Sequence, residues 1–309
     1  MEYRVVIQNI FVLFALIGVG FLAGKKRVVS PDASKDLTNL LMKITLPATI
    51  FASLIRPYDS GLLKDSVICF VFGIVFFLFS MALAFFLAKR MHVQSGKRGV
   101  WILAATFSNT GFVGFPVANA VFGAEGLFLA SMINLAFNIL VFSVGVKIAC
   151  MDSEESGVIS LKKILVGNVN IAIVLGLFFF ITQISVPDPV MTLVNYFGGV
   201  TTPLSMFIIG LTMSRGRLKD LFTDMDAFVV SLIRLVAMPI LAFVLLKLLP
   251  FEAGSMIPGL AVLIIAMPAP SVCMILAEQY GGNTDFAGKA IFISSLLCMI
   301  TIPGILLLI

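Results

Sequence analysis

The chain has 309 residues, of which 60% are hydrophobic and only 12% are charged, and its mean hydropathy is +1.11. Soluble domains carry about 25% charged residues, roughly twice this share, so a soluble globule is excluded, and so is a disordered chain. The net charge of +5 comes from short basic loops between apolar runs. This placement indicates membrane topology and not nucleic-acid binding.

Apolar runs of about 20 residues recur along the chain and predict an all-α integral membrane protein with ten transmembrane helices. In chain order they cover about residues 5–24, 37–55, 66–88, 98–122, 125–149, 163–185, 190–213, 227–249, 257–280 and 286–309. Fifteen of the 21 Lys and Arg residues lie in loops after odd-numbered spans, and four lie on the opposite side. By the positive-inside rule, this predicts a multi-pass protein of the cell (inner) membrane with both termini extracytoplasmic.

The two halves of the chain resemble each other after a shift of 156 residues. Between residues 31–51 and 187–207, seven of 21 positions match, including two prolines and several polar residues. The shift covers five spans, so the second copy enters the membrane from the opposite side. Such a 5+5 inverted repeat, here about 1–150 and 160–309 within one membrane domain, is typical of secondary transporters.

The fourth span of each half is predicted to be broken near the middle of the membrane. The residues that interrupt the helices are Gly111, Gly114, Pro116, Pro268 and Pro270. Backbone groups that such breaks free are tolerated only where protein, water or a ligand satisfies them. The amino ends of the half-helices carry partial positive charge, which favours a carboxylate. Gly111, Pro268 and Pro270 at these ends are therefore candidate substrate-binding residues as well as hinges.

Few polar side chains lie inside the predicted spans, and several lie close to the breaks. The candidate substrate ligands among them are Asn109, Thr110, Ser271, Thr45 and Asn170, because amides and hydroxyls can donate to a carboxylate. Other interpretations stay open for three of them. Asn109 could join two helices, Thr45 could bond back to its own helix, and Asn170 could cap one.

Two basic residues, Lys43 and Arg234, lie about two turns inside spans two and eight. Each could extend to the membrane surface or stay buried as a cation that attracts an anion or replaces a coupling cation. No Asp lies deep in any span, and Glu278 lies near a span end, which argues against an ion relay built on Asp. The sequence has no phosphate-binding loop and no hydrolase motif, so we expect no enzyme, no cofactor and no metal.

Both breaks resemble the auxin efflux carrier family, which includes the plant PIN exporters and bacterial malonate and malate permeases. The resemblance rests on Asn109–Pro116, on Met267–Pro270 with Ala277–Tyr280, and on Asn168–Asn170. It implies crossing spans four and nine in a fold like that of bile-acid/sodium symporters and NhaA. It also implies a homodimer, elevator motion and a carboxylate substrate near the crossing.

The family pattern assigns spans and residues to roles. By resemblance, the scaffold comprises about 5–24, 37–55, 163–185 and 190–213, and the transport domain about 66–149 and 227–309. Asn109 and Asn170 match substrate contacts, Pro268 matches the crossover proline, and Ser271 matches a pocket position.

Three residues depart from the plant pattern. Val169 and Ser108 stand where plant members have prolines, and Lys43 has no basic counterpart. These departures favour an acid that is smaller and more charged than auxin.

The leading hypothesis is a secondary transporter of small organic anions in the lipid bilayer, of a mono- or dicarboxylate such as malonate or malate. Asn109, Thr110 and Ser271 would donate to carboxylate oxygens, Asn170 would face them, and Lys43 would balance a second charge. One alternative is a cation-coupled antiporter that uses Lys43. Another is a non-transporting sensor with a carrier fold. Coupling to a proton or to sodium stays open.

Overall fold

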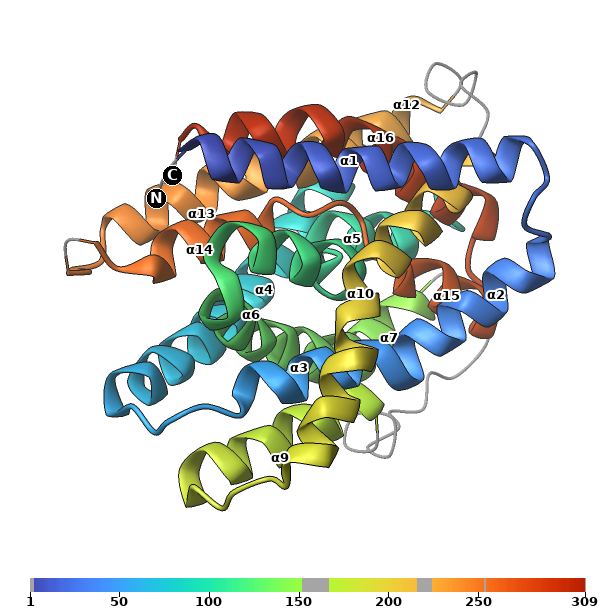
Figure 1. Cartoon of the computed structure of the whole chain (residues 1–309). Coiled ribbons are helices and arrows are strands. Elements are labelled where there is room, and N and C mark those ends of the chain that lie inside the picture. Colours follow the sequence, from blue (N-terminus) through green and yellow to red (C-terminus); the bar gives the residue numbers. More distant parts are fainter. Residues whose placement is uncertain (1–2, 152–166, 216–223, 253, 309) are drawn as a thin grey trace.

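The computed structural model describes residues 3–151, 167–215, 224–252 and 254–308, which form helices and the turns between them, with no strand in these ranges (Figure 1). Six described stretches are long and apolar enough to cross a membrane: Ala33–Leu54, Ser60–Arg90, Arg98–Ala149, Asp188–Ser214, Met225–Lys247 and Thr284–Leu306. Shorter apolar helices cover Phe11–Lys25, Asn168–Thr182 and Met256–Ile265. The predicted all-α membrane fold is confirmed, and the count of ten spans stays a prediction.

The helices are interrupted by short π-helical turns. The first half contains α1 (Tyr3–Lys25), α2 (Pro31–Leu40), η1 (Leu41–Thr45), α3 (Leu46–Leu54), α4 (Ser60–Arg90), α5 (Arg98–Thr106), η2 (Thr110–Gly114), α6 (Phe115–Leu140), η3 (Val141–Gly145) and α7 (Val146–Ala149). The second half contains α9 (Asn168–Thr182), α10 (Asp188–Arg215), α12 (Met225–Leu232), η4 (Ile233–Ala237), α13 (Met238–Lys247), α14 (Met256–Ile265), α15 (Val272–Gln279) and α16 (Thr284–Leu306).

Several helices start where a side-chain oxygen caps the first turn. Asp59, Asp224 and Asn283 accept hydrogen bonds from backbone N–H groups of α4, α12 and α16, respectively. The stretch Arg98–Ala149 has 52 residues. A straight helix of this size would be about 78 Å long at about 1.5 Å per residue, more than twice the thickness of the hydrocarbon layer. The stretch turns at Gly123, whose φ of 68° is unstrained only for glycine.

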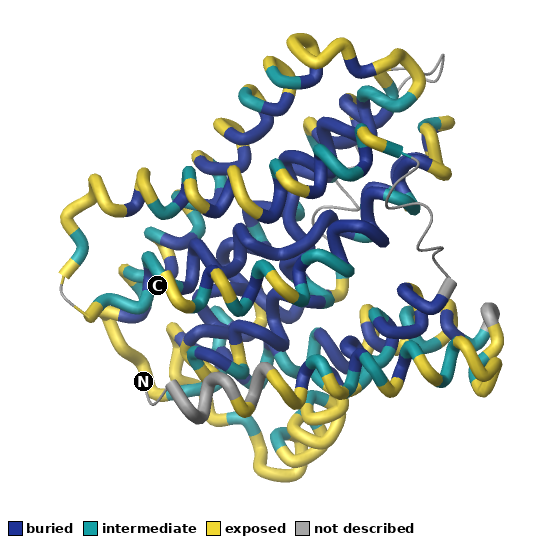
Figure 2. Tube along the Cα trace, turned by 90° about the horizontal axis from the view of Figure 1, so that it is seen from above, coloured by how far each residue is buried: buried dark blue, intermediate teal, exposed yellow. Residues whose placement is uncertain are grey.

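The helices pack in two groups. In the first group, α1 lies along α10, and α3 lies between α9 and α10. In the second group, α4 and α14 pack on α6, and α12 packs on α16. Figure 2 shows buried residues through the middle of the molecule, with exposed residues on its outer faces.

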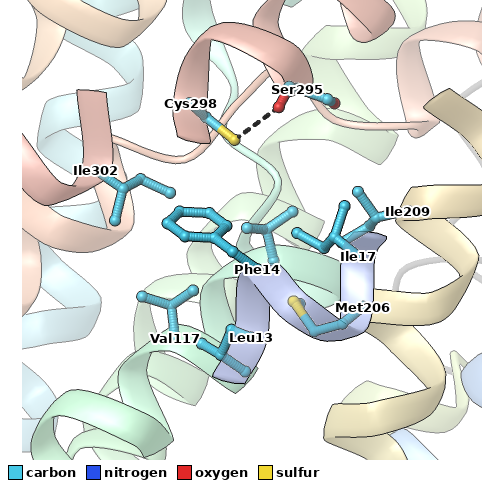
Figure 3. A pocket seen from close by; sticks show the side chains of 10 residues that line it. Leu13, Phe14, Ile17, Val117, Met206, Ile209, Ser295, Cys298 and Ile302 are labelled. Carbon is cyan, nitrogen blue, oxygen red and sulfur yellow. Dashed lines mark hydrogen bonds between the residues drawn. The ribbon is translucent and has the colours of Figure 1, made fainter. Parts of the chain in front are cut away.

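A narrow apolar gap separates the two groups beside η2. Leu13 and Ile17 of α1 and Met206 of α10 line one side, and Val117 of α6 and Ile302 of α16 line the other (Figure 3). The gap has a volume of only about 10 Å³, close to the minimum for one water molecule. The two groups therefore meet here through apolar side chains.

Candidate functional site

Two helices break at the same place and are joined there by their main chains. Helix α5 ends at Thr106, and its C-cap Phe107 is extended. Helix α14 ends at Ile265, and α15 begins at Val272. The N–H of Asn109 donates to the carbonyl oxygen of Pro268 at 2.8 Å. Both breaks that the prolines and glycines predict are present, and one hydrogen bond connects them.

The local sequence explains the first break. The Asn109 side-chain oxygen accepts from the N–H of Phe112 at 3.1 Å and so caps the turn that restarts the helix. The N–H of Gly114 donates to the Asn109 carbonyl at 3.0 Å. A Cβ on Gly114 would lie 3.2 Å from Ile264 Cδ1. A glycine at this position therefore allows η2 and α14 to approach closely.

Proline and serine shape the second break. Pro268 and Pro270 lack an N–H, so this segment cannot continue the hydrogen-bonding pattern of α14. The N–H of Ala269, between them, donates to Ser294 Oγ of α16 at 3.0 Å. Sequence reasoning missed Ser294, because a lone serine in an apolar helix usually bonds to its own turn, and Ser294 Oγ does also donate to the Ile291 carbonyl at 3.2 Å.

The guanidinium of Arg234 connects the carboxyl ends of both broken helices. Its side chain is 0% exposed. Nη1 donates to the carbonyls of Thr106 at 2.9 Å and Ala105 at 3.4 Å, at the end of α5. Nε donates to the Met267 carbonyl at 3.2 Å, and Nη2 donates to that of Ile265, at the end of α14. Of the two alternatives for Arg234, the structure selects the buried cation, and not the extension to the surface.

The place where the two breaks meet is called the crossing below. Five of the candidate residues lie in the breaks and in the turns beside them: Asn109, Gly111, Pro268, Pro270 and Ser271. Asn109 is 6% exposed, and its Nδ2 makes no hydrogen bond with the described residues. Ser271 is half-buried at the N-cap of α15, where its side chain forms no capping bond. Asn109 and Ser271 thus retain donors for a ligand.

Thr110 is placed differently. Its side chain is 0% exposed, and Oγ1 donates to Asn134 Oδ1 of α6 at 2.5 Å. This hydroxyl proton is therefore used inside the protein. Sequence reasoning had not paired Asn134 with Thr110, because the pairing depends on how α6 folds back beside η2.

The remaining candidates lie on the first group of helices. A Cβ on Gly111 would lie 3.8 Å from Leu46, the residue after Thr45. Thr45 is buried, and its Oγ1 makes no hydrogen bond with the described residues, so the bond back to its helix is absent. Asn170 is buried and accepts from Asn138 Nδ2 of α6 at 2.7 Å. Lys43 is exposed.

The charges around the crossing favour an anion. The amino ends of η2 and α15 face it with positive partial charge, while the negative carboxyl ends of α5 and α14 are bonded to Arg234. Among the described residues, Arg234 is the only charged side chain that is buried. Two hydroxyls of the first break, of Thr106 and Ser108, are also buried without a hydrogen-bond partner among those residues.

Comparison with known proteins identifies the family of this chain. A family model described as "Membrane transport protein" matches residues 5–306. The chain belongs to the auxin efflux carrier family of membrane transport proteins. The predicted membership of this family is thereby confirmed. A member of this family is a transporter and not an enzyme.

Relatives of this auxin efflux carrier family member match along nearly their whole length. An "Uncharacterized transporter" of Methanothermobacter thermautotrophicus is 27% identical over 300 residues, covering 96% of each chain. A "Putative malonate transporter" of Rhizobium meliloti is 23% identical over 307 residues, covering 96% of this chain and 93% of the relative. The "Uncharacterized transporter YfdV" of Escherichia coli is 22% identical over 308 residues, covering 96% and 95%. The chain is thus a multi-pass membrane transporter.

Proposed function

We propose that this transporter carries small organic anions, namely mono- or dicarboxylates such as malonate or malate, and that it binds them at the crossing. The main support for this proposal is the electrostatic character of the crossing. Two helix amino ends face it, Arg234 is buried beside it, and no carboxylate is buried among the described residues. The name of the Rhizobium meliloti relative supports malonate as the first substrate to test.

In this proposal, the carboxylate accepts hydrogen bonds from Asn109 Nδ2 and Ser271 Oγ, with Thr45 approaching from the first group. Pro268 and Pro270 keep the second segment non-helical, and Gly111 lies beside Leu46 of the first group. Lys43, whose side chain is exposed, would balance the second charge of a dicarboxylate. Asn170 contacts Asn138 and so lies where the two groups of helices meet.

The proposed mechanism is an elevator motion of the second group against the first. Their separate packing and the apolar gap between them support this division into transport domain and scaffold. Matching contacts support the inverted repeat. A Cβ on Gly20 would meet the Phe207 carbonyl at 2.1 Å, and one on Gly176, 156 positions later, would meet Leu54 at 2.4 Å. We further propose ten spans, extracytoplasmic termini in a cell (inner) membrane, and a scaffold-mediated homodimer.

The test is uptake of labelled malonate and malate by proteoliposomes. Asn109→Asp keeps the oxygen that caps Phe112 but replaces the amide donor by a negative charge, so we expect uptake to fall at least about tenfold while the protein stays folded. Asn109→Ala should abolish uptake. The loss of the cap should lower the free energy of unfolding by about 1 kcal/mol.

Asn119→Ala is the matched control, because Asn119 lies in the same stretch and is exposed. Uptake by this variant should equal that of the wild type. Wild-type uptake by folded Asn109→Asp protein would disprove the proposed site. Binding of the acids without any counterflow would instead indicate a sensor. Repeating the assay with and without sodium and proton gradients identifies the coupling ion.

A further inference from the structure

Helix α4 exposes an apolar strip along most of its length. At about 100° per residue, the positions of the exposed side chains place them on one face of the helix. They are Val67, Val71, Val75, Leu78, Phe79, Phe85 and Phe86. From Val67 to Phe86, the strip is about 28 Å long at about 1.5 Å per residue, close to the thickness of the hydrocarbon layer. In a protein that crosses a bilayer, this strip faces lipid acyl chains.

A basic hollow begins where the apolar strip ends. It has a volume of about 780 Å³, and its lining includes Phe85 and Phe86 from the strip. The polar groups that line it come from the end of α4, the following turn and the start of α5: Lys89, His92, Gln94, Ser95 and Arg98. Among the residues that the structure describes, no Asp or Glu lines the hollow. Its size suits a small polar headgroup.

The charges in the hollow are not neutralised by acids within the described part of the chain. Neither Lys89 nor Arg98 forms an ion pair with a described residue, whereas the adjacent Lys97 forms one with Asp226. The Arg98 guanidinium is held in place by the Val93 carbonyl, which accepts from Nε at 3.4 Å and from Nη2 at 3.2 Å. A fixed guanidinium with further free donors is well suited to a phosphate group.

We infer that an anionic phospholipid binds here, with its acyl chains along the α4 strip and its phosphate in the hollow beside Lys89 and Arg98. Charge complementarity and the continuity of strip and hollow select this ligand. Sugar or amine headgroups without net negative charge would leave the basic groups uncompensated. The site is distinct from the crossing, since none of the residues that line it belongs to either break.

Native mass spectrometry of the full chain in detergent tests this inference. The probes are phosphatidylglycerol and phosphatidylcholine with identical acyl chains. We expect the wild type to bind phosphatidylglycerol more tightly. Lys89→Gln should weaken that binding about fivefold, the effect of removing one basic residue near an anionic headgroup. Binding of phosphatidylcholine should stay unchanged.

Arg90→Gln is the matched control, because Arg90 is the next residue, is exposed, and does not line the hollow. It should leave phosphatidylglycerol binding nearly unchanged. Equal wild-type affinity for the two lipids would overturn the inference, and so would equal losses in Lys89→Gln and Arg90→Gln. Complete displacement of phosphatidylglycerol by inorganic phosphate would show a site for free anions and would also overturn it.

Discussion

At the scale of single residues, Arg234 has the clearest structural role. A buried charge in a membrane protein is costly unless polar groups surround it. Here four backbone carbonyls, of Ala105, Thr106, Ile265 and Met267, accept from one guanidinium. These carbonyls have lost their helical partners at the breaks. Arg234 and the broken helices therefore stabilise each other.

We expect Arg234→Met to destabilise the protein by about 3–5 kcal/mol, because several buried carbonyls lose their donor. Arg234→Lys should recover only part of this, since a lysine ammonium cannot bridge both helix ends with a planar fork of donors. The measurement is the thermal unfolding midpoint in detergent. Arg90→Met serves as the control, because Arg90 is exposed. A midpoint for Arg234→Met equal to that of the control would refute this role.

At the scale of elements, the pair α1 and α10 is held at close distance by small residues. A Cβ on Gly20 would lie 2.1 Å from the Phe207 carbonyl oxygen, and one on Gly210 would lie 2.1 Å from that of Ile17. A Cβ on Gly24 would lie 2.0 Å from Ser214 Oγ. Membrane helices that lack a hydrophobic driving force associate through such close backbone contact. This close packing suits the fixed scaffold of the proposed mechanism.

Gly20→Ala should force α1 away from α10 and destabilise the protein by about 1–3 kcal/mol through overpacking. Gly18→Ala is a matched control on the same helix, because a Cβ there meets nothing within 4 Å. This control should be neutral or slightly stabilising, since alanine favours a helix over glycine. Thermal unfolding of the two variants measures the difference. Equal midpoints would mean that α1 and α10 do not need this close contact.

At the scale of the whole molecule, the two groups of helices meet across few polar contacts. The gap in Figure 3 is lined mainly by apolar side chains from both groups. Polar contacts also join α6 to the first group: the bond from Asn138 to Asn170 of α9 and the ion pair of Glu125 with Arg56 at 3.6 Å. Apolar surfaces have no directional bonds to break when they slide. The arrangement therefore suits relative motion better than a continuous polar interface would.

A disulfide between the groups should stop transport, whereas one within a group should not. In a variant without the four native cysteines, Leu13→Cys with Val117→Cys joins α1 to α6 across the gap. Leu13→Cys with Met206→Cys joins α1 to α10 and is the control, since all three positions line the same cavity. Malonate counterflow is measured after oxidation with copper phenanthroline and again after reduction. Full transport with the first disulfide formed would contradict motion between the groups.

Features set by local sequence could be predicted, and features set by distant neighbours could not. Pro268, Pro270 and Gly114 act on their own backbone, so the breaks follow from the sequence. Lys43 and Arg234 lie at similar depth in their spans, yet Lys43 is exposed and Arg234 is buried. The burial of Arg234 depends on carbonyl groups of α5 and of the segment after α14 that accept from its guanidinium, and these lie far from Arg234 in the sequence. The partners of Ser294 and Asn134 depend on tertiary packing in the same way.

The hydrogen bond that joins the two breaks affects how freely the sequence around them can change during evolution. The N–H of Asn109 donates to the carbonyl of Pro268. Every residue has a backbone carbonyl, and every residue except proline has a backbone N–H. Substitution at either position, except by proline at 109, keeps the two backbone groups that form this bond. Side chains around it can therefore change with a new cargo while the crossing stays in place. A chain that is 22–27% identical to the relatives named above can keep the architecture and exchange the substrate.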